Sequence, residues 1–127
     1  MIKEDYCSFE VSKLLKEKGF DVLCRAYWDN QPSLNTRTLF WTVEPHHYDR
    51  EVSAPTHQMA MRWMRDVYDI HISVNKSFLI NDVDNKTYLV YVCTKKCHTS
   101  YNAWSEYHST YEEAVESALK YCLTELI

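Results

Sequence analysis

Hydrophobic residues recur at helical spacing in three stretches of the chain. In the first stretch, residues 8–18, Val11, Leu14 and Leu15 fall on one face while lysines and glutamates occupy the others. Gly19 and Phe20 follow directly, a combination typical of a helix that ends in a left-handed glycine with an apolar residue behind it. The pattern therefore predicts a helix that ends at Gly19.

The second helical stretch lies within SAPTHQMAMRWMRDVYDIHISV, residues 53–74. Ser53 or Thr56 can cap this helix, and Pro55 suits its first turn, where no amide donor is needed. The spacing i, i+3, i+4, i+7 predicts a buried face made of Ala60, Trp63, Met64 and Val67.

The third stretch, STYEEAVESALKYCLTELI, ends the given sequence. Thr110 with Glu113 forms a capping box, and Ser109 with Glu112 offers an alternative register. Apolar residues at helical spacing predict that the helix packs on the core through Ala114, Val115, Ala118, Leu119, Cys122 and Leu126.

Alternation with a period of two predicts strands between these helices. It covers residues 22–28, 37–43 and 70–74, and the apolar run 87–93 suits a central strand. The segment DNQPSLN, residues 29–35, has the composition of a turn. Residues 94–108 have no clear pattern, and we expect a loop with a short edge strand near residues 103–107.

This order, α-β-β-α-β-β-(β)-α, predicts one α+β domain spanning residues 1–127. We expect a single antiparallel sheet of four to five strands that packs against three helices. Because helices would cover only one face, the other face of the sheet would stay open.

Composition narrows the possible functions. The 127 residues are 46% hydrophobic and 25% charged, as in a globular protein. The single glycine excludes a glycine-rich phosphate loop and the usual nucleophile elbow. A formal net charge of −4 argues against general nucleic-acid binding, which depends on a basic surface. The sequence shows no cofactor motif and no complete catalytic constellation, which favours a non-catalytic protein.

Hydropathy and cysteine content indicate the compartment. No apolar run is long enough to span a membrane, and the first residues, MIKEDYCSFEVSK, lack the apolar core of an export signal. Five cysteines without an export signal suggest reduced thiols. We therefore expect a cytoplasmic protein that has no membrane partner.

One short motif, CTKKCH, resembles part of a metal site. Cys93, Cys97 and His98 can supply three zinc ligands, and His108, His46 or His47 could be the fourth. The gap between Cys93 and Cys97 is three residues, and the sequence has no Cys-x-x-Cys pair to support this interpretation. A strand end followed by an ordinary turn therefore remains the favoured alternative, and we assign no metal.

Two further groups of residues are candidates for binding a ligand or partner. The loop EPHHYDR contains His46, His47, Tyr48 and Arg50, and it suits an interface, a solvated connector or a nucleotide site. In the second helix and the strand after it, the polar candidates are His57, Arg62 and His71. His57 falls in the first helical turn, where backbone amides can hold an anion, but we expect it to be an exposed polar residue.

Aromatic residues are abundant on the predicted strands. We expect some of them to form an outer face that suits a protein partner or a second copy of the chain. The aromatic candidates are Trp28, Phe40, Trp41, Tyr88, Tyr91, Tyr101, Trp104 and Tyr107.

Three blocks of the sequence resemble a family of small proteins from gut Bacteroides and their phages. The blocks are SFEVSKLLKEKGF, SAPTHQMAMRWMRD and YEEAVESALKYCLTELI. The resemblance implies a phage or mobile-element protein that works in a bacterial cytoplasm. It implies no activity and assigns no site residue. The leading hypothesis is therefore a non-catalytic interaction protein that self-associates; the alternatives are a small-ligand (nucleotide) binder and a small metal-dependent enzyme.

Overall fold

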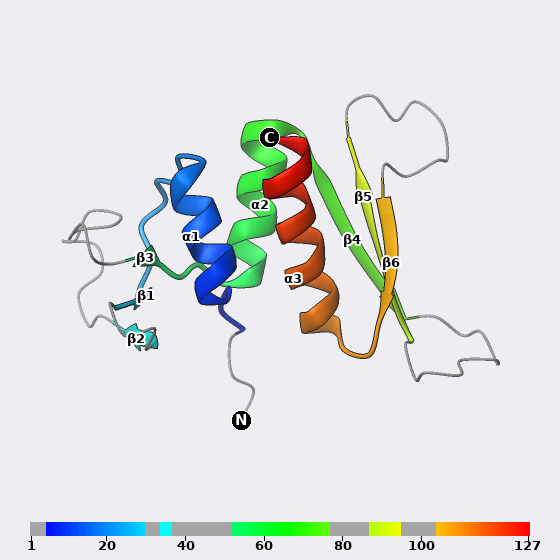
Figure 1. The fold of residues 1–127 in the computed structure, drawn as a ribbon, viewed down its shortest axis with the longest axis horizontal. Coiled ribbons are helices and arrows are strands. Elements are labelled where there is room, and N and C mark those ends of the chain that lie inside the picture. The colour runs from blue at the N-terminus through cyan, green and yellow to red at the C-terminus, as the bar shows by residue number, and fades with distance from the viewer. Residues whose placement is uncertain (1–4, 30–33, 37–51, 77–86, 95–103) are drawn as a thin grey trace.

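The computed structural model describes residues 5–29, 34–36, 52–76, 87–94 and 104–127 (Figure 1). Three α-helices and six strands follow one another in these segments, and a π-helical turn, η2, continues the last helix. In chain order the elements are α1 (Phe9–Glu17), β1 (Ala26–Trp28), β2 (Leu34–Thr36), β3 (Val52–Ser53), α2 (His57–Tyr68), β4 (His71–Lys76), β5 (Tyr88–Cys93), β6 (Trp104–His108), α3 (Tyr111–Tyr121) and η2 (Cys122–Leu126).

The α+β class and the three helices are confirmed, but the single sheet is wrong. The described strands form two antiparallel sheets, one in the order β2–β1–β3 and one in the order β4–β5–β6. The helices lie between the two sheets (Figure 1). Strand β1 pairs with β3 immediately before α2 begins, so α2 separates this pair from β4. Alternation along a strand predicts that one face is buried, but it does not identify the neighbouring strand.

Individual strands were predicted with mixed success. Strand β5 is central in its sheet, and β6 is a short edge strand, as expected. The first predicted strand is shorter than residues 22–28 because only Ala26–Trp28 pair, and Val22 is exposed. Strand β2 begins at Leu34, inside the segment whose composition suggested a turn. The predicted strand at 37–43 lies outside the described residues.

Local capping signals position the helices, and the N-caps of α2 and α3 are among the residues predicted for them. Ser8, Thr56 and Thr110 are the N-caps of α1, α2 and α3, and each side chain accepts a hydrogen bond from the amide three residues later. At the end of α1, Gly19 has φ +89°, and the amide of Phe20 donates to the carbonyl of Leu15. These contacts form a Schellman motif, which explains why glycine stands at this position.

The buried face of α2 is shifted from the predicted one. Ala60 and Met64 are fully buried, but Val67 is 55% exposed, so its assignment to the core is wrong. Trp63 lies on the same edge of the helix and still reaches the core, where its ring meets Phe20 edge-on at 5.4 Å. A valine is too short to do the same. No helix in the described segments has the length and apolar character needed to cross a membrane.

Candidate functional site

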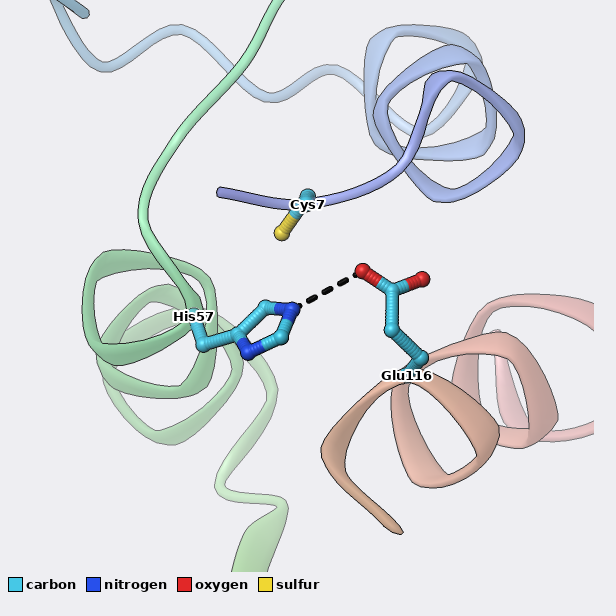
Figure 2. Close-up of side chains that lie close together, drawn as sticks. All are labelled: Cys7, His57 and Glu116. Atoms are coloured by element: carbon cyan, nitrogen blue, oxygen red, sulfur yellow. Dashed lines mark hydrogen bonds and ion pairs between the residues drawn. The ribbon is translucent and has the colours of Figure 1, made fainter. Parts of the chain in front are cut away.

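A thiol, an imidazole and a carboxylate meet where three segments of the chain converge. They belong to Cys7 before α1, His57 in the first turn of α2, and Glu116 in α3 (Figure 2). One potential ligand atom from each residue lies within 4.8 Å of those of the other two. We call these three residues the Cys7–His57–Glu116 cluster.

Backbone hydrogen bonds bring Cys7 beside His57. The amide of Cys7 donates to the carbonyl of Pro55, and the amide of His57 donates to the carbonyl of Asp5, both at 2.9 Å. The segment before α1 therefore runs along the start of α2. This arrangement places the Cys7 side chain close to the imidazole of His57.

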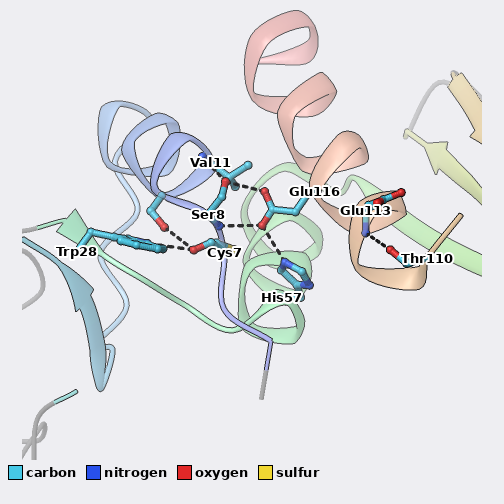
Figure 3. A network of polar contacts seen from close by, with 9 residues as sticks. Cys7, Ser8, Val11, Trp28, His57, Thr110, Glu113 and Glu116 are labelled. Carbon is cyan, nitrogen blue, oxygen red and sulfur yellow. Dashed lines mark hydrogen bonds and ion pairs between the residues drawn. The ribbon is translucent and has the colours of Figure 1, made fainter. Parts of the chain in front are cut away.

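Glu116 joins the cluster by accepting hydrogen bonds from two other elements. Its Oε1 accepts from the Ser8 amide at 2.8 Å and lies 2.8 Å from Nε2 of His57, while Oε2 accepts from the Ser8 hydroxyl at 2.7 Å (Figure 3). In a capping box, a Glu or Gln three residues after the N-cap accepts the N-cap amide. Here that position is Val11, which cannot accept, and Glu116 of α3 takes over the role for α1.

The carbonyl of Cys7 is also held in place. It accepts hydrogen bonds from Nε1 of Trp28 at 3.1 Å and from the hydroxyl of Ser12 at 3.3 Å. Together with the amide bond to Pro55, these contacts occupy both backbone polar groups of Cys7. The position of the backbone that carries the thiol is therefore fixed by the surrounding fold.

Burial and hydrogen bonding act on the acidity of the cluster in opposite ways. Burial alone would raise the pKa of Glu116, but the hydrogen bonds from His57 and Ser8 outweigh it and lower the pKa. The pKa of the Cys7 thiol is raised well above its ordinary value, mainly by burial and further by the negative charge of Glu116. Without a bound cation, Cys7 is therefore a neutral thiol at physiological pH.

This geometry does not suit nucleophilic catalysis by Cys7. In a Cys–His–carboxylate triad, the two ring nitrogens face the thiol and the carboxylate separately. Figure 2 shows one ring nitrogen of His57 facing Glu116 on the side of Cys7, while the second nitrogen points away from both. The Cys7 side chain is also fully buried and protonated, so it is not an exposed thiolate.

His57 is the one predicted site residue that the cluster contains, and its predicted environment was wrong. It is only 5% exposed, because the segment around Cys7 and helix α3 both cover the first turn of α2. Two of the first three amides of α2, those of His57 and Met59, already donate to Asp5 and Thr56. An anion would therefore compete with these acceptors.

Arg62 and His71 do not join the cluster. Arg62 is exposed on α2 and pairs with Asp66 at 3.4 Å. His71, at the start of β4, lies 2.8 Å from the carboxylate of Asp69. Both contacts are ordinary surface pairs between neighbours in the sequence, which contribute little to stability.

The other candidates lie mostly outside the described residues. His46, His47, Tyr48 and Arg50 belong to the segment 37–51, and Cys97 and His98 belong to the segment 95–103. Cys93 is the last residue of β5, and His108 ends β6, where its Nε2 lies 3.1 Å from Glu106.

Sequence reasoning did not select Cys7 or Glu116. Glu116 is 108 residues from Ser8 and 59 residues from His57, and no local pattern connects positions so far apart. Only the fold brings Ser8, His57 and Glu116 together at the cluster.

The second feature is the face of the β4–β5–β6 sheet that points away from α3. The opposite face packs on α3, where Trp104 stacks on Tyr121 at 4.9 Å and Val90 and Val92 are fully buried. Strand alternation and register place eight other residues on the outward face, across three strands. They are His71, Ser73, Asn75, Leu89, Tyr91, Cys93, Ser105 and Tyr107.

The aromatic content of this outward face is smaller than predicted. Tyr91 and Tyr107 point outward, whereas Tyr88 and Trp104 contact Tyr111 and Tyr121 of α3. Trp28 packs edge-on against Phe9, and it belongs to the other sheet. Phe40, Trp41 and Tyr101 lie outside the described residues.

Comparisons with known proteins add no further identification: no protein-family model, no curated protein and no solved structure matches the chain. The resemblance to the phage-associated family therefore stays a prediction.

Proposed function

We propose that this protein is a non-catalytic interaction protein that associates with a second copy of itself through the outward face of the β4–β5–β6 sheet. The main support is the chemistry of that face. None of its eight residues is Asp, Glu, Lys or Arg, although a quarter of the chain is charged. No element of the described chain packs on it (Figure 1).

A second copy is the occupant that this chemistry favours. In a two-fold dimer, the same patch meets itself, so a charged residue near the axis would face its own copy. A face without charged residues avoids that repulsion. Each copy has a formal net charge of −4, so two copies repel each other more when they meet through more highly charged surfaces.

The rows of side chains on this face suit a flat contact. Leu89 lies between Asn75 and Tyr107 in the register, and Tyr91 lies between Ser73 and Ser105. A tyrosine supplies apolar area and a hydroxyl that can hydrogen-bond across an interface. Leu89, Tyr91 and Tyr107 would therefore form the centre of the interface, with serine and asparagine around them.

The size of the face sets the expected affinity. Three strands about 4.8 Å apart and five to six residues long span roughly 14 by 18 Å. A standard stable interface buries about 800 Å² on each partner, which is more than this face alone provides. We therefore expect a weak dimer that forms at micromolar or higher concentration.

Sedimentation velocity over a range of protein concentrations tests this proposal. The wild-type protein should change from monomer to dimer as its concentration rises. Tyr107→Glu places a carboxylate on the interface, where it faces its own copy, and should keep the protein monomeric. Because Tyr107 is 40% exposed on an edge strand, the variant should fold normally, which circular dichroism can check.

Val67→Glu is the matched control. Val67 is exposed and apolar like Tyr107, but it lies on α2, so its substitution should leave the dimer intact. A wild-type protein that stays monomeric at every concentration would refute the proposal. A dimer that survives Tyr107→Glu would show that another surface carries the contact.

A further inference from the structure

We infer that the Cys7–His57–Glu116 cluster is a zinc-class metal site, with Cys7 Sγ, His57 Nε2 and one carboxylate oxygen of Glu116 as ligands. These are the three donor types that Zn²⁺ prefers in proteins. This site differs from the metal site considered around Cys93, Cys97 and His98. It is also independent of the proposed dimer, because none of its ligands lies on the outward face of the sheet.

The positions of the donor atoms need only a small adjustment. Zn–ligand bonds of about 2.0 to 2.3 Å in a tetrahedral site place the donor atoms about 3.5 Å apart. In the cluster all three lie within 4.8 Å of one another, and Nε2 of His57 is 2.8 Å from Oε1 of Glu116. A metal ion would replace the hydrogen bond between His57 and Glu116 and bring the three donor atoms to the spacing of a tetrahedral site.

The groups around the ligands hold them in this arrangement. The amide and the hydroxyl of Ser8 orient the Glu116 carboxylate. The carbonyl of Cys7 is held by Trp28 and Ser12, which fixes the backbone that carries the thiol. Such supporting hydrogen bonds are characteristic of metal sites because they orient the ligands before the metal arrives.

Charge balance favours a divalent ion in this buried place. A thiolate and a carboxylate bring two negative charges, and a neutral imidazole brings none, so a divalent cation gives a neutral site. On binding, Cys7 releases its thiol proton to solvent, and the imidazole proton moves from Nε2 to Nδ1. In the metal-free structure Nδ1 has no hydrogen-bond partner within the described chain, so it is free to take up this proton.

The fourth position can be taken by water. Within the described residues the group contains three ligands, which is the number that open zinc sites use. Cys7 and His57 are almost completely buried, whereas the Glu116 side chain is a quarter exposed. Water and metal would therefore enter on the Glu116 side.

Titration of the reduced, chelator-treated protein with Co²⁺ tests the inference. Cobalt bound to a thiolate gives a sulfur-to-metal charge-transfer band, and tetrahedral cobalt gives intense visible bands. We expect both with one equivalent of Co²⁺, and their loss when Zn²⁺ is added. Zn²⁺ should also raise the melting temperature of the wild-type protein.

Two variants assign the site. Cys7→Ser should abolish the charge-transfer band, and Glu116→Gln, which keeps the thiol, should weaken Co²⁺ binding at least tenfold. The second variant decides the test if the first does not fold. Cys93→Ser is the control and should bind like the wild type.

Two outcomes would overturn the inference. If the wild-type protein gives no cobalt band and no stabilisation by Zn²⁺, the cluster is a network of hydrogen bonds only. If Cys93→Ser loses the band while Cys7→Ser keeps it, the metal binds near Cys93 instead.

Discussion

Glu116 accepts hydrogen bonds at a place where burial alone would raise the pKa of its carboxyl group. Two of the bonds come from Ser8 and the third from His57. The two donors of Ser8 are fixed by the start of α1, and His57 is fixed by the start of α2. The carboxylate therefore stabilises the ends of two helices at once, without a bound metal.

Replacing this carboxylate should destabilise the protein. In Glu116→Gln, the negative charge is lost, and one of the two oxygens becomes an amide NH₂ that no longer accepts hydrogen bonds. Hydrogen bonds to a charged group contribute about 1.5–3 kcal/mol, so we expect a loss of that order in the free energy of unfolding at neutral pH. Urea unfolding in the presence of a chelator measures it.

The loss should depend on pH in a defined direction. The pKa of Glu116 in the folded protein is lowered from its ordinary value of 4.5, so the unfolded chain takes up the proton first as pH falls. The stabilisation is complete above about pH 4.5 and disappears as pH falls through the folded pKa, where wild type and variant should converge. Glu112→Gln is the control, since Glu112 is exposed on the same helix. Equal losses in the two variants at neutral pH would contradict this account.

At the scale of elements, the start of α3 shows which of two possible N-caps the helix uses. The sequence allowed two capping registers, Thr110 with Glu113 and Ser109 with Glu112. In the structure the hydroxyl of Thr110 accepts from the amide of Glu113 at 3.1 Å, and the helix begins at Tyr111.

The two registers predict different mutant stabilities. Thr110→Ala removes the cap and should cost about 1 kcal/mol in the free energy of unfolding. Ser109→Ala removes a hydroxyl one position earlier and should change the stability by less than about 0.5 kcal/mol. Thermal or urea unfolding of both variants measures the difference. A larger effect at Ser109 would mean that α3 starts one residue earlier.

Elements with complete local signals were predicted well, and those without them were not. The stop signal of α1 and the N-caps of α2 and α3 each lie within one helical turn, and β5 has its own continuous apolar run. Strand β2 has no such signal. It is three residues long, and it is a strand because it pairs with β1. Its turn-like composition does not predict that pairing.

At the scale of the whole molecule, the missing information was which elements pack together. The α+β class follows from the number and type of elements, but their division into two sheets depends on β1 pairing with β3. The Cys7–His57–Glu116 cluster has the same origin. Each of its residues looks ordinary in its own segment, and only packing of α1 and α2 against α3 makes them neighbours.

The same packing should control which thiols can react. Cys7, Cys24 and Cys122 are buried in the common core, whereas Cys93 at the end of β5 is partly exposed. Burial raises the pKa of Cys7 and raises that of Cys122 to about 12, so neither offers a thiolate in the folded protein. In chelator-treated protein, alkylation followed by mass spectrometry of peptides should find Cys93 modified first among the four cysteines that the structure describes. Cys7 and Cys122 should follow together, slower by a factor of about 10³ or more, because both require the core to open. The addition of dilute urea should accelerate both equally.

If Cys7 instead reacts as fast as Cys93 while Cys122 stays protected, the segment before α1 detaches on its own, and the hydrogen bonds of Ser8 and His57 with Glu116 do not hold it to the core.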